Sequence, residues 1–279
     1  MPALGPQQIV DAILWAIQES GETGQLTSAA RTHPCRFVVS GPLGVTELWV
    51  YAWTLTPGGR PQLENEYRIQ MTSVTSPLAL NPGGPTVLIG FEPGRKMFAG
   101  FDLQRHQRFT MGSPSVQIDI TAIHIALQDG FAFDKKGNGE IAVGVRPDQF
   151  MAYARTAAEL HRHGRDRNTF RLLKRVAAVS GPPVSPRAIA PLSGGAKRIV
   201  QTINRLARDA NFRAQVMTAY SNRCAVTRMQ LRVIEAAHVL PVGAPGSVDH
   251  VCNGIALSRT YHRAYDNGLI YVLVSNIQG

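Results

Sequence analysis

The sequence contains few cysteines, and none of them lies in a disulfide-forming or metal-binding pattern. Cys35, Cys224 and Cys252 are far apart in a chain of 279 residues, and no Cys-x-x-Cys pair occurs. This spacing argues against a disulfide scaffold and against a zinc site built from four cysteines. We therefore expect a protein of a reducing compartment, without a structural zinc.

Long hydrophobic runs and a secretory signal are also missing. No apolar run approaches the roughly 20 residues that a membrane span requires, and residues 1–15 lack a charged region and a small-residue cleavage site. Hydrophobic residues make up 44% of the chain and charged residues 17%, which favours packed cores over disorder. We expect a cytoplasmic protein with no membrane partner, folded as two modest domains or one large domain.

Positive charge is concentrated in the second part of the chain. Residues 161–279 carry 17 Lys and Arg against 5 Asp and Glu, whereas residues 1–160 carry 12 against 14. Such an excess predicts a polyanionic partner, most simply nucleic acid, although a solvated basic face would give the same count. Arg outnumbers Lys in this part, and Arg suits bidentate contacts with phosphate and guanine.

Hydrophobic periodicity predicts a self-contained α+β domain over residues 1–161. Apolar residues at helical spacing predict helices over 7–19 and 114–128 and a closing helix over 147–161. The helix expected to start near Ser115 would present its amino terminus to a phosphate. The predicted strands cover 35–40, 45–53, 66–71, 86–91, 96–102 and 140–145.

A different composition follows this domain. Residues 162–196 are basic and rich in proline, which predicts a semi-rigid linker that also contacts DNA phosphates. Residues 197–279 predict a second domain, which opens with two helices split near Asp209. The phosphate contacts expected from the basic stretch are Arg165, Arg167, Arg171 and Lys174.

One constellation in the second domain carries chemistry. His238 ends a short apolar strand, Asn253 lies at a turn before a second strand, and His262 and Asp266 share one face of a following helix. A strand, a loop, a strand and a helix with these side chains suit phosphodiester hydrolysis with one divalent metal. In that chemistry His238 takes the proton of the attacking water, and Asn253 fixes the loop or orients the imidazole.

The segments FRAQVMTAYSNRCAVTRMQLRVIEAAHVLP and NGIALSRTYHRAYDNGLI resemble the HNH, or ββα-metal, nuclease family over about residues 205–270. The resemblance implies a hydrolase, an endodeoxyribonuclease whose catalytic residues are His238, Asn253 and His262. It makes His238 the general base, and His262 and Asp266 metal ligands. The implied cofactor is one divalent ion per site, Mg or Mn, with Zn, Ni or Co as further options.

The chain departs from many HNH sites at one position. Those sites carry a metal-binding His or Asp directly before the base, where this chain has Ala237. Glu235 lies two residues earlier and so on the same face of the strand. The Glu235 carboxylate would either bind the metal or form hydrogen bonds to the metal ligands. If it does neither, a water molecule takes the coordination position that is empty at Ala237. Asp249 is expected in a solvated loop.

The two-domain arrangement resembles McrA-like, modification-dependent (type IV) restriction endonucleases. EYRIQ, LIGF, FDLQRH and SPSVQ are similar to the sulfur-binding domain that reads phosphorothioated DNA. Arginines would hold the backbone and base edges, while an apolar wall would favour sulfur over the better hydrated oxygen. The DNA-binding residues expected in this domain are Tyr67, Arg68, Arg105, His106, Arg108 and Pro114.

The fold class expected from these observations is α+β, with an amino-terminal mixed α/β recognition domain followed by a ββα-metal HNH nuclease domain. The expected substrate is modified double-stranded DNA, phosphorothioated as the first choice and methylated at cytosine or adenine as the second. An ordinary sequence-specific HNH endonuclease and a non-catalytic DNA-binding sensor are the alternatives. Because cutting two strands takes two sites, we expect a homodimer, at least on DNA.

Overall fold

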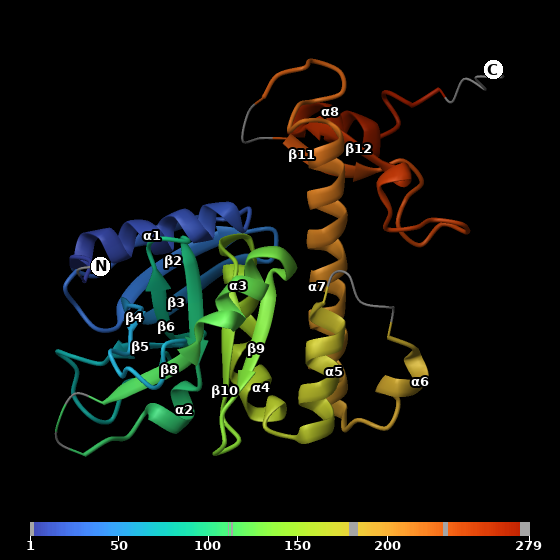
Figure 1. Cartoon of the computed structure of the whole chain (residues 1–279). Helices are drawn as coiled ribbons and strands as arrows, with labels where there is room; N and C mark the ends of the chain where they lie inside the picture. Colours follow the sequence, from blue (N-terminus) through green and yellow to red (C-terminus); the bar gives the residue numbers. More distant parts are fainter. Residues whose placement is uncertain (1–2, 111, 113, 179–183, 231–233, 274–279) are drawn as a thin grey trace. The chain divides into compact units, whose positions relative to one another are not determined.

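The computed structural model describes residues 3–110, 112, 114–178, 184–230 and 234–273. The chain forms two compact units, Met1–Ala207 and Arg208–Gly279, whose elements are labelled in Figure 1. Among the described residues, no helix is both long and apolar enough to cross a bilayer.

A seven-stranded sheet organises the first unit. Its strand order is β1-β2-β3-β6-β7-β10-β9, and every neighbouring pair is antiparallel except β3 and β6, which are parallel. The strands are β1 (Thr23–Leu26), β2 (Cys35–Gly41), β3 (Gly44–Thr54), β6 (Thr86–Glu92), β7 (Met97–Phe101), β9 (Phe131–Lys135) and β10 (Ile141–Val145).

A smaller sheet and several helices complete the first unit. The small sheet has the order β4-β5-β8 and consists of β4 (Thr56–Pro57), β5 (Glu66–Gln70) and β8 (Ser115–Asp119). The helices are α1 (Pro6–Glu19), α2 (Leu103–His106), α3 (Ile120–Asp129), the 3₁₀ turn η1 (Pro147–Gln149), α4 (Phe150–Gly164), α5 (Arg167–Ala177) and α6 (Pro186–Ile189).

The large sheet is covered on both faces, because successive side chains of its central strands enter two different cores. On β6, Ile89 belongs to the core that contains α1, α4 and α5. The neighbouring Leu88 belongs to the core that contains β5, β8 and α3. Both faces of this sheet are therefore occupied, which explains why β7 and β10 are apolar throughout.

The helix predicted over 114–128 is wrong in its first part. Residues Ser115–Asp119 form strand β8, in which Val116 and Ile118 are buried two positions apart, and α3 starts only at Ile120. The amino terminus of α3 is already capped, because the Asp119 carboxylate accepts a hydrogen bond from the Thr121 amide (2.8 Å). The phosphate site expected near Ser115 is therefore also wrong.

The described part of the expected linker belongs to the first unit. Helix α5 buries Leu172, Leu173 and Val176 in the core of α1 and α4, and α6 buries Ile189 there as well. The prolines Pro182 and Pro183 lie outside the described residues. The compact first unit extends to Ala207.

The two helices predicted around Asp209 are one continuous helix, α7 (Gly194–Ala219). No Gly or Pro interrupts it after Gly195. Ala207 and Ala210, three residues apart, are buried across the expected break, and Phe212 and Val216, four residues apart, are buried beyond it. Packing of this apolar stripe outweighs the weak helix propensity of Asp209 and Asn211.

The second unit holds the strand–loop–strand–helix pattern. Strand β11 (Ile234–His238) pairs antiparallel with β12 (Gly254–Ser258), and α8 (Arg259–Asp266) follows directly. A 3₁₀ turn, η2 (Val251–Asn253), precedes β12. The core comprises Phe212, Val216, Cys224, Ile234, Ala237, Ala256 and Leu257.

Candidate active site

His238 is held in place at the end of β11 by a ring and a carboxylate. Its imidazole stacks on Phe212 of α7, with ring centres 3.8 Å apart and planes inclined by 7°. Its Nε2 lies 3.1 Å from Oδ1 of Asp249 in the following loop. The sequence position of Asp249 predicts a solvated loop, but in the structure its carboxylate contacts His238.

Asn253 fixes the loop between β11 and β12. Its Oδ1 accepts a hydrogen bond from the Leu240 amide (2.7 Å), and its Nδ2 donates to the carbonyl oxygens of Leu240 and Val248 (3.1 Å each). The side chain is buried, so these bonds are protected from competition by water. Of the two roles expected for Asn253, the geometry matches the fixing of the loop.

Helix α8 brings His262 between two carboxylates. The His262 Nδ1 lies 2.8 Å from Oε2 of Glu235, and its Nε2 lies 3.5 Å from Oδ2 of Asp266. Burial raises the pKa of Glu235, but the hydrogen bonds from His262 and Arg259 outweigh burial and bring this pKa below its ordinary value. Glu235 is thus an anion that supports His262 from Nδ1 and leaves Nε2 on the side of Asp266.

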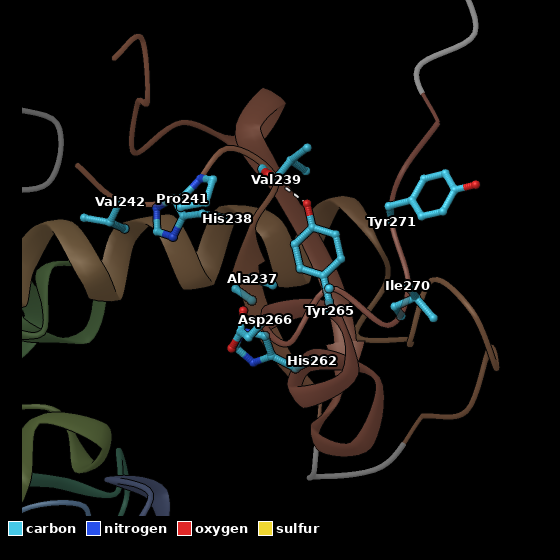
Figure 2. Close-up of a pocket in the computed structure, with 12 residues that line it drawn as sticks. Ala237, His238, Val239, Pro241, Val242, His262, Tyr265, Asp266, Ile270 and Tyr271 are labelled. Atoms are coloured by element: carbon cyan, nitrogen blue, oxygen red, sulfur yellow. Dashed lines mark hydrogen bonds and ion pairs between the residues drawn. The ribbon is translucent and has the colours of Figure 1, made fainter. Parts of the chain in front are cut away.

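Of these side chains, His238, His262 and Asp266 line one pocket of about 550 Å³ in the second unit. In Figure 2, Ala237 lies between His238 and the His262–Asp266 pair, and Tyr265 donates a hydrogen bond to the Val239 carbonyl oxygen (2.7 Å). The lining residues are Ala236, Ala237, His238, Val239, Pro241, Val242, His262, Tyr265, Asp266, Gly268, Ile270 and Tyr271.

The donor set of this pocket fits a divalent metal with few protein ligands. His262 Nε2 and the Asp266 carboxylate are adjacent donors; carboxylate suits Mg²⁺ and Mn²⁺, and imidazole suits ions such as Zn²⁺ and Ni²⁺. Within the described residues, no group of three His, Cys, Asp or Glu side chains could hold a metal by itself. Mg²⁺ and Mn²⁺ commonly keep several waters and bind substrate phosphates, so two protein ligands are sufficient.

Comparisons with known proteins match two segments of the chain. Residues 224–273 match the family model described as HNH endonuclease, and residues 46–154 match the model described as Methylase-associated X1. No curated protein and no solved structure matches the chain. The expected fold class is confirmed: a mixed α/β amino-terminal domain precedes an HNH domain.

The HNH match supports a nuclease of the hydrolase class that binds DNA, and HNH domains generally depend on a divalent metal. The Methylase-associated X1 match indicates a link to a DNA-modification system.

Three of the cations predicted to contact DNA bind buried carboxylates in the first unit. His106 Nε2 lies 2.5 Å from Oε1 of Glu140, and Arg105 Nε lies 3.6 Å from its Oε2. Arg165 forms an ion pair with Asp102. Sequence spacing did not reveal these pairs, and they give Arg105, His106 and Arg165 a structural function.

The remaining candidates fall into two groups in the first unit. Tyr67 and Arg68 lie half-buried on β5, opposite Ile118 and Gln117 of β8, and Pro114 directly precedes β8. The structure thus brings Tyr67, Arg68 and Pro114 onto one small sheet. The exposed cations are Arg108 on the connection after α2, and Arg167, Arg171 and Lys174 on α5.

The buried carboxylates predict an acid-sensitive first unit. Burial raises the pKa of Asp102, but its charged and hydrogen-bonding partners, Arg165 first among them, lower this pKa by more than burial raises it. Burial likewise raises the pKa of Glu140, and His106 and Arg105 together lower it by more. Both pKa values therefore lie below their ordinary values in the folded protein. This contribution to stability is present above the unfolded pKa near 4 and is lost as pH falls through the folded pKa.

We expect Arg165→Ala to lower the free energy of unfolding by about 1–2 kcal/mol at pH 7, because it leaves the Asp102 charge uncompensated while its own side chain is partly exposed. Urea unfolding at pH 7 and pH 3 measures the effect, with Arg108→Ala as the matched control. The difference between the two variants should shrink at pH 3. Equal stability of both variants at pH 7 would contradict the structural function of Arg165.

Proposed function

We propose that this protein is a metal-dependent HNH endonuclease that restricts modified DNA. The observation that carries the proposal is that His238, His262 and Asp266 line one pocket together. A general base and a metal-binding pair are the two parts that phosphodiester hydrolysis requires.

Each side chain of the site has a distinct function in this proposal. His238 accepts the proton of the attacking water, and Asn253 keeps the adjoining loop in position. His262 and Asp266 would hold the divalent metal, and Glu235 orients His262. When bound, the metal neutralises charge on the scissile phosphate and on the leaving oxygen.

The basic residues of the first unit support DNA as the substrate. Arg162, Arg171 and Arg175 line a pocket of about 520 Å³ formed by α4, α5, α6 and the start of α7. Clustered arginines of this kind bind phosphates, and the affinity they give falls with salt concentration. With Arg167 and Lys174, they form the proposed phosphate-binding surface. A homodimer on DNA would supply one site for each strand.

The choice of modification rests on the first unit. Resemblance to sulfur-binding domains favours phosphorothioated DNA, with Tyr67, Arg68, Arg108 and Pro114 as the proposed recognition residues. The family name Methylase-associated X1 favours methylation as the second candidate, in one of two forms. Either methylated DNA is cut, or DNA is cut where a partner methylase has left it unmodified.

A binding experiment with full-length His238→Ala separates recognition of phosphorothioated DNA from recognition of methylated DNA. We expect at least a tenfold lower Kd for a short duplex with one phosphorothioate than for the plain duplex, about 1.4 kcal/mol of discrimination. A duplex methylated at cytosine or adenine is the third ligand, and fluorescence anisotropy at fixed salt measures all three. Tighter binding of the methylated duplex would mean that the protein recognises methylation and not the phosphorothioate. Equal affinities for the three duplexes would contradict recognition of modified DNA.

A further inference from the structure

The loop between β11 and β12 places a carboxylate directly against the proposed general base. Asp249 Oδ1 and His238 Nε2 are 3.1 Å apart, and each side chain is 18% exposed. Asn253 holds this loop through the carbonyl oxygen of Val248, the residue before Asp249. Because Phe212 stacks on the imidazole, the ring plane is also fixed. The contact therefore belongs to a packed arrangement.

The charge of Asp249 determines which ring nitrogen of His238 carries the proton. Burial raises the pKa of Asp249, but hydrogen bonds and charge from Arg208, together with the His238 contact, lower that pKa below its ordinary value. An ionised carboxylate only accepts hydrogen bonds. The His238 Nε2 must therefore carry the proton in this contact, which leaves the lone pair of the neutral ring on Nδ1.

We propose that Asp249 is a positioning residue that prepares His238 to act as a base through Nδ1. The inference rests on the proposed nuclease function. In the reaction, an O–H bond of water breaks and an Nδ1–H bond forms, while the water oxygen bonds to phosphorus and the 3′ oxygen leaves with its electron pair. Asp249 keeps its charge, holds the ring in the Nε2–H tautomer and stabilises the imidazolium, as the carboxylate does in Ser–His–Asp triads.

Arg208 supplies the alternative explanation for the same carboxylate. It lies on α7 and donates from Nε to Asp249 Oδ2 at 2.8 Å, so Asp249 would merely attach the loop to the helix. Its side chain is 60% exposed, and exposed ion pairs contribute little to stability. If attachment were the whole role, loss of Arg208 would have the same effect as loss of Asp249.

Three variants separate the two explanations. Asp249→Asn keeps the shape but presents an amide, Asp249→Glu keeps the charge, and Arg208→Gln removes only the ion pair. Single-turnover cleavage at saturating DNA should fall about 10²–10⁴-fold in Asp249→Asn, as for the same exchange in protease triads. We expect partial recovery in Asp249→Glu and a rate within a few-fold of wild type in Arg208→Gln. Equal losses in Asp249→Asn and Arg208→Gln would overturn the proposal.

A readout without DNA or metal keeps this inference separate from the nuclease function. ¹⁵N NMR of histidine-labelled full-length protein reports which ring nitrogen carries the proton, and His238→Gln identifies the signal. We expect the Nε2–H tautomer in wild type and in Arg208→Gln, and its loss in Asp249→Asn. If the wild type shows this pattern but cuts no DNA, the nuclease proposal fails and the positioning contact stands. An Nδ1–H tautomer in wild type would overturn the role of Asp249.

Discussion

Replacement of His238 by alanine is expected to reduce DNA cleavage by about 10²–10⁴-fold, the usual contribution of a general base. The imidazole ends β11, faces the pocket and contacts Asp249. Binding of DNA should change little, since the proposed phosphate-binding arginines lie in the first unit. Single-turnover cleavage and anisotropy on the same duplex measure the two effects separately.

The control for this variant is His124→Ala. His124 is an exposed histidine on α3 of the first unit and bonds to Arg95, and it contacts none of the residues placed in the proposed site. Its loss should leave the cleavage rate within twofold of wild type. Wild-type cleavage by His238→Ala, or equal losses in both variants, would contradict the assignment of the base.

Loss of His262 is expected to have an effect at least as large as loss of His238, through the metal. His262→Ala should abolish cleavage at millimolar Mn²⁺, because it removes the imidazole donor beside Asp266. Glu235→Gln keeps both donors but weakens the support of His262, so its half-saturating metal concentration should rise about 10–100-fold. Activity titrations with Mn²⁺, and calorimetric titrations of metal binding, measure the metal requirement of each variant.

Thermal unfolding must accompany these titrations, because Glu235 also joins β11 to α8 through Arg259. A folded His262→Ala with the metal requirement of wild type would contradict a metal site at this pair. If Glu235→Gln lost as much metal affinity and cleavage as His262→Ala, Glu235 would instead be a direct metal ligand.

The residues of the proposed site could be located in the sequence because they lie close together along the chain. His238, Asn253, His262 and Asp266 follow one another on β11, η2 and α8, and their catalytic roles stay predictions. Asp249 could not be found this way. It lies in an irregular loop without periodicity, 11 residues after His238 and 41 after Arg208, and its role depends on a tertiary contact.

Charge in the first unit was also predicted only in part. Arg105 and His106 suggested a DNA contact, but Glu140, 34 residues later, lies beside them across the fold. Sequence patterns show the sign of a side chain and not its partner. Arg171 is exposed on α5, and its contact with DNA phosphates stays a prediction.

Most apolar strands of the large sheet could be predicted, but β9 (Phe131–Lys135) was missed although its first three residues are apolar and buried. Strands β6 and β10 lie where apolar runs indicated. Strand β1 has a mostly polar sequence, TGQL, and pairs only at the sheet edge, so it gave no signal. In β8, Val116 lies four residues before Ile120 and so also fits the helix that follows, but the burial of Ile118 and the pairing with β5 decide for a strand.

Cleavage by the wild-type protein tests the central claim most directly. The substrates are one short duplex in plain, phosphorothioated and methylated form, each incubated with Mg²⁺, Mn²⁺ or EDTA. The account predicts metal-dependent cutting of the phosphorothioated duplex, none in EDTA, and little of the plain duplex. Binding without cleavage of any duplex, in either metal, would contradict the account and favour a non-catalytic DNA sensor.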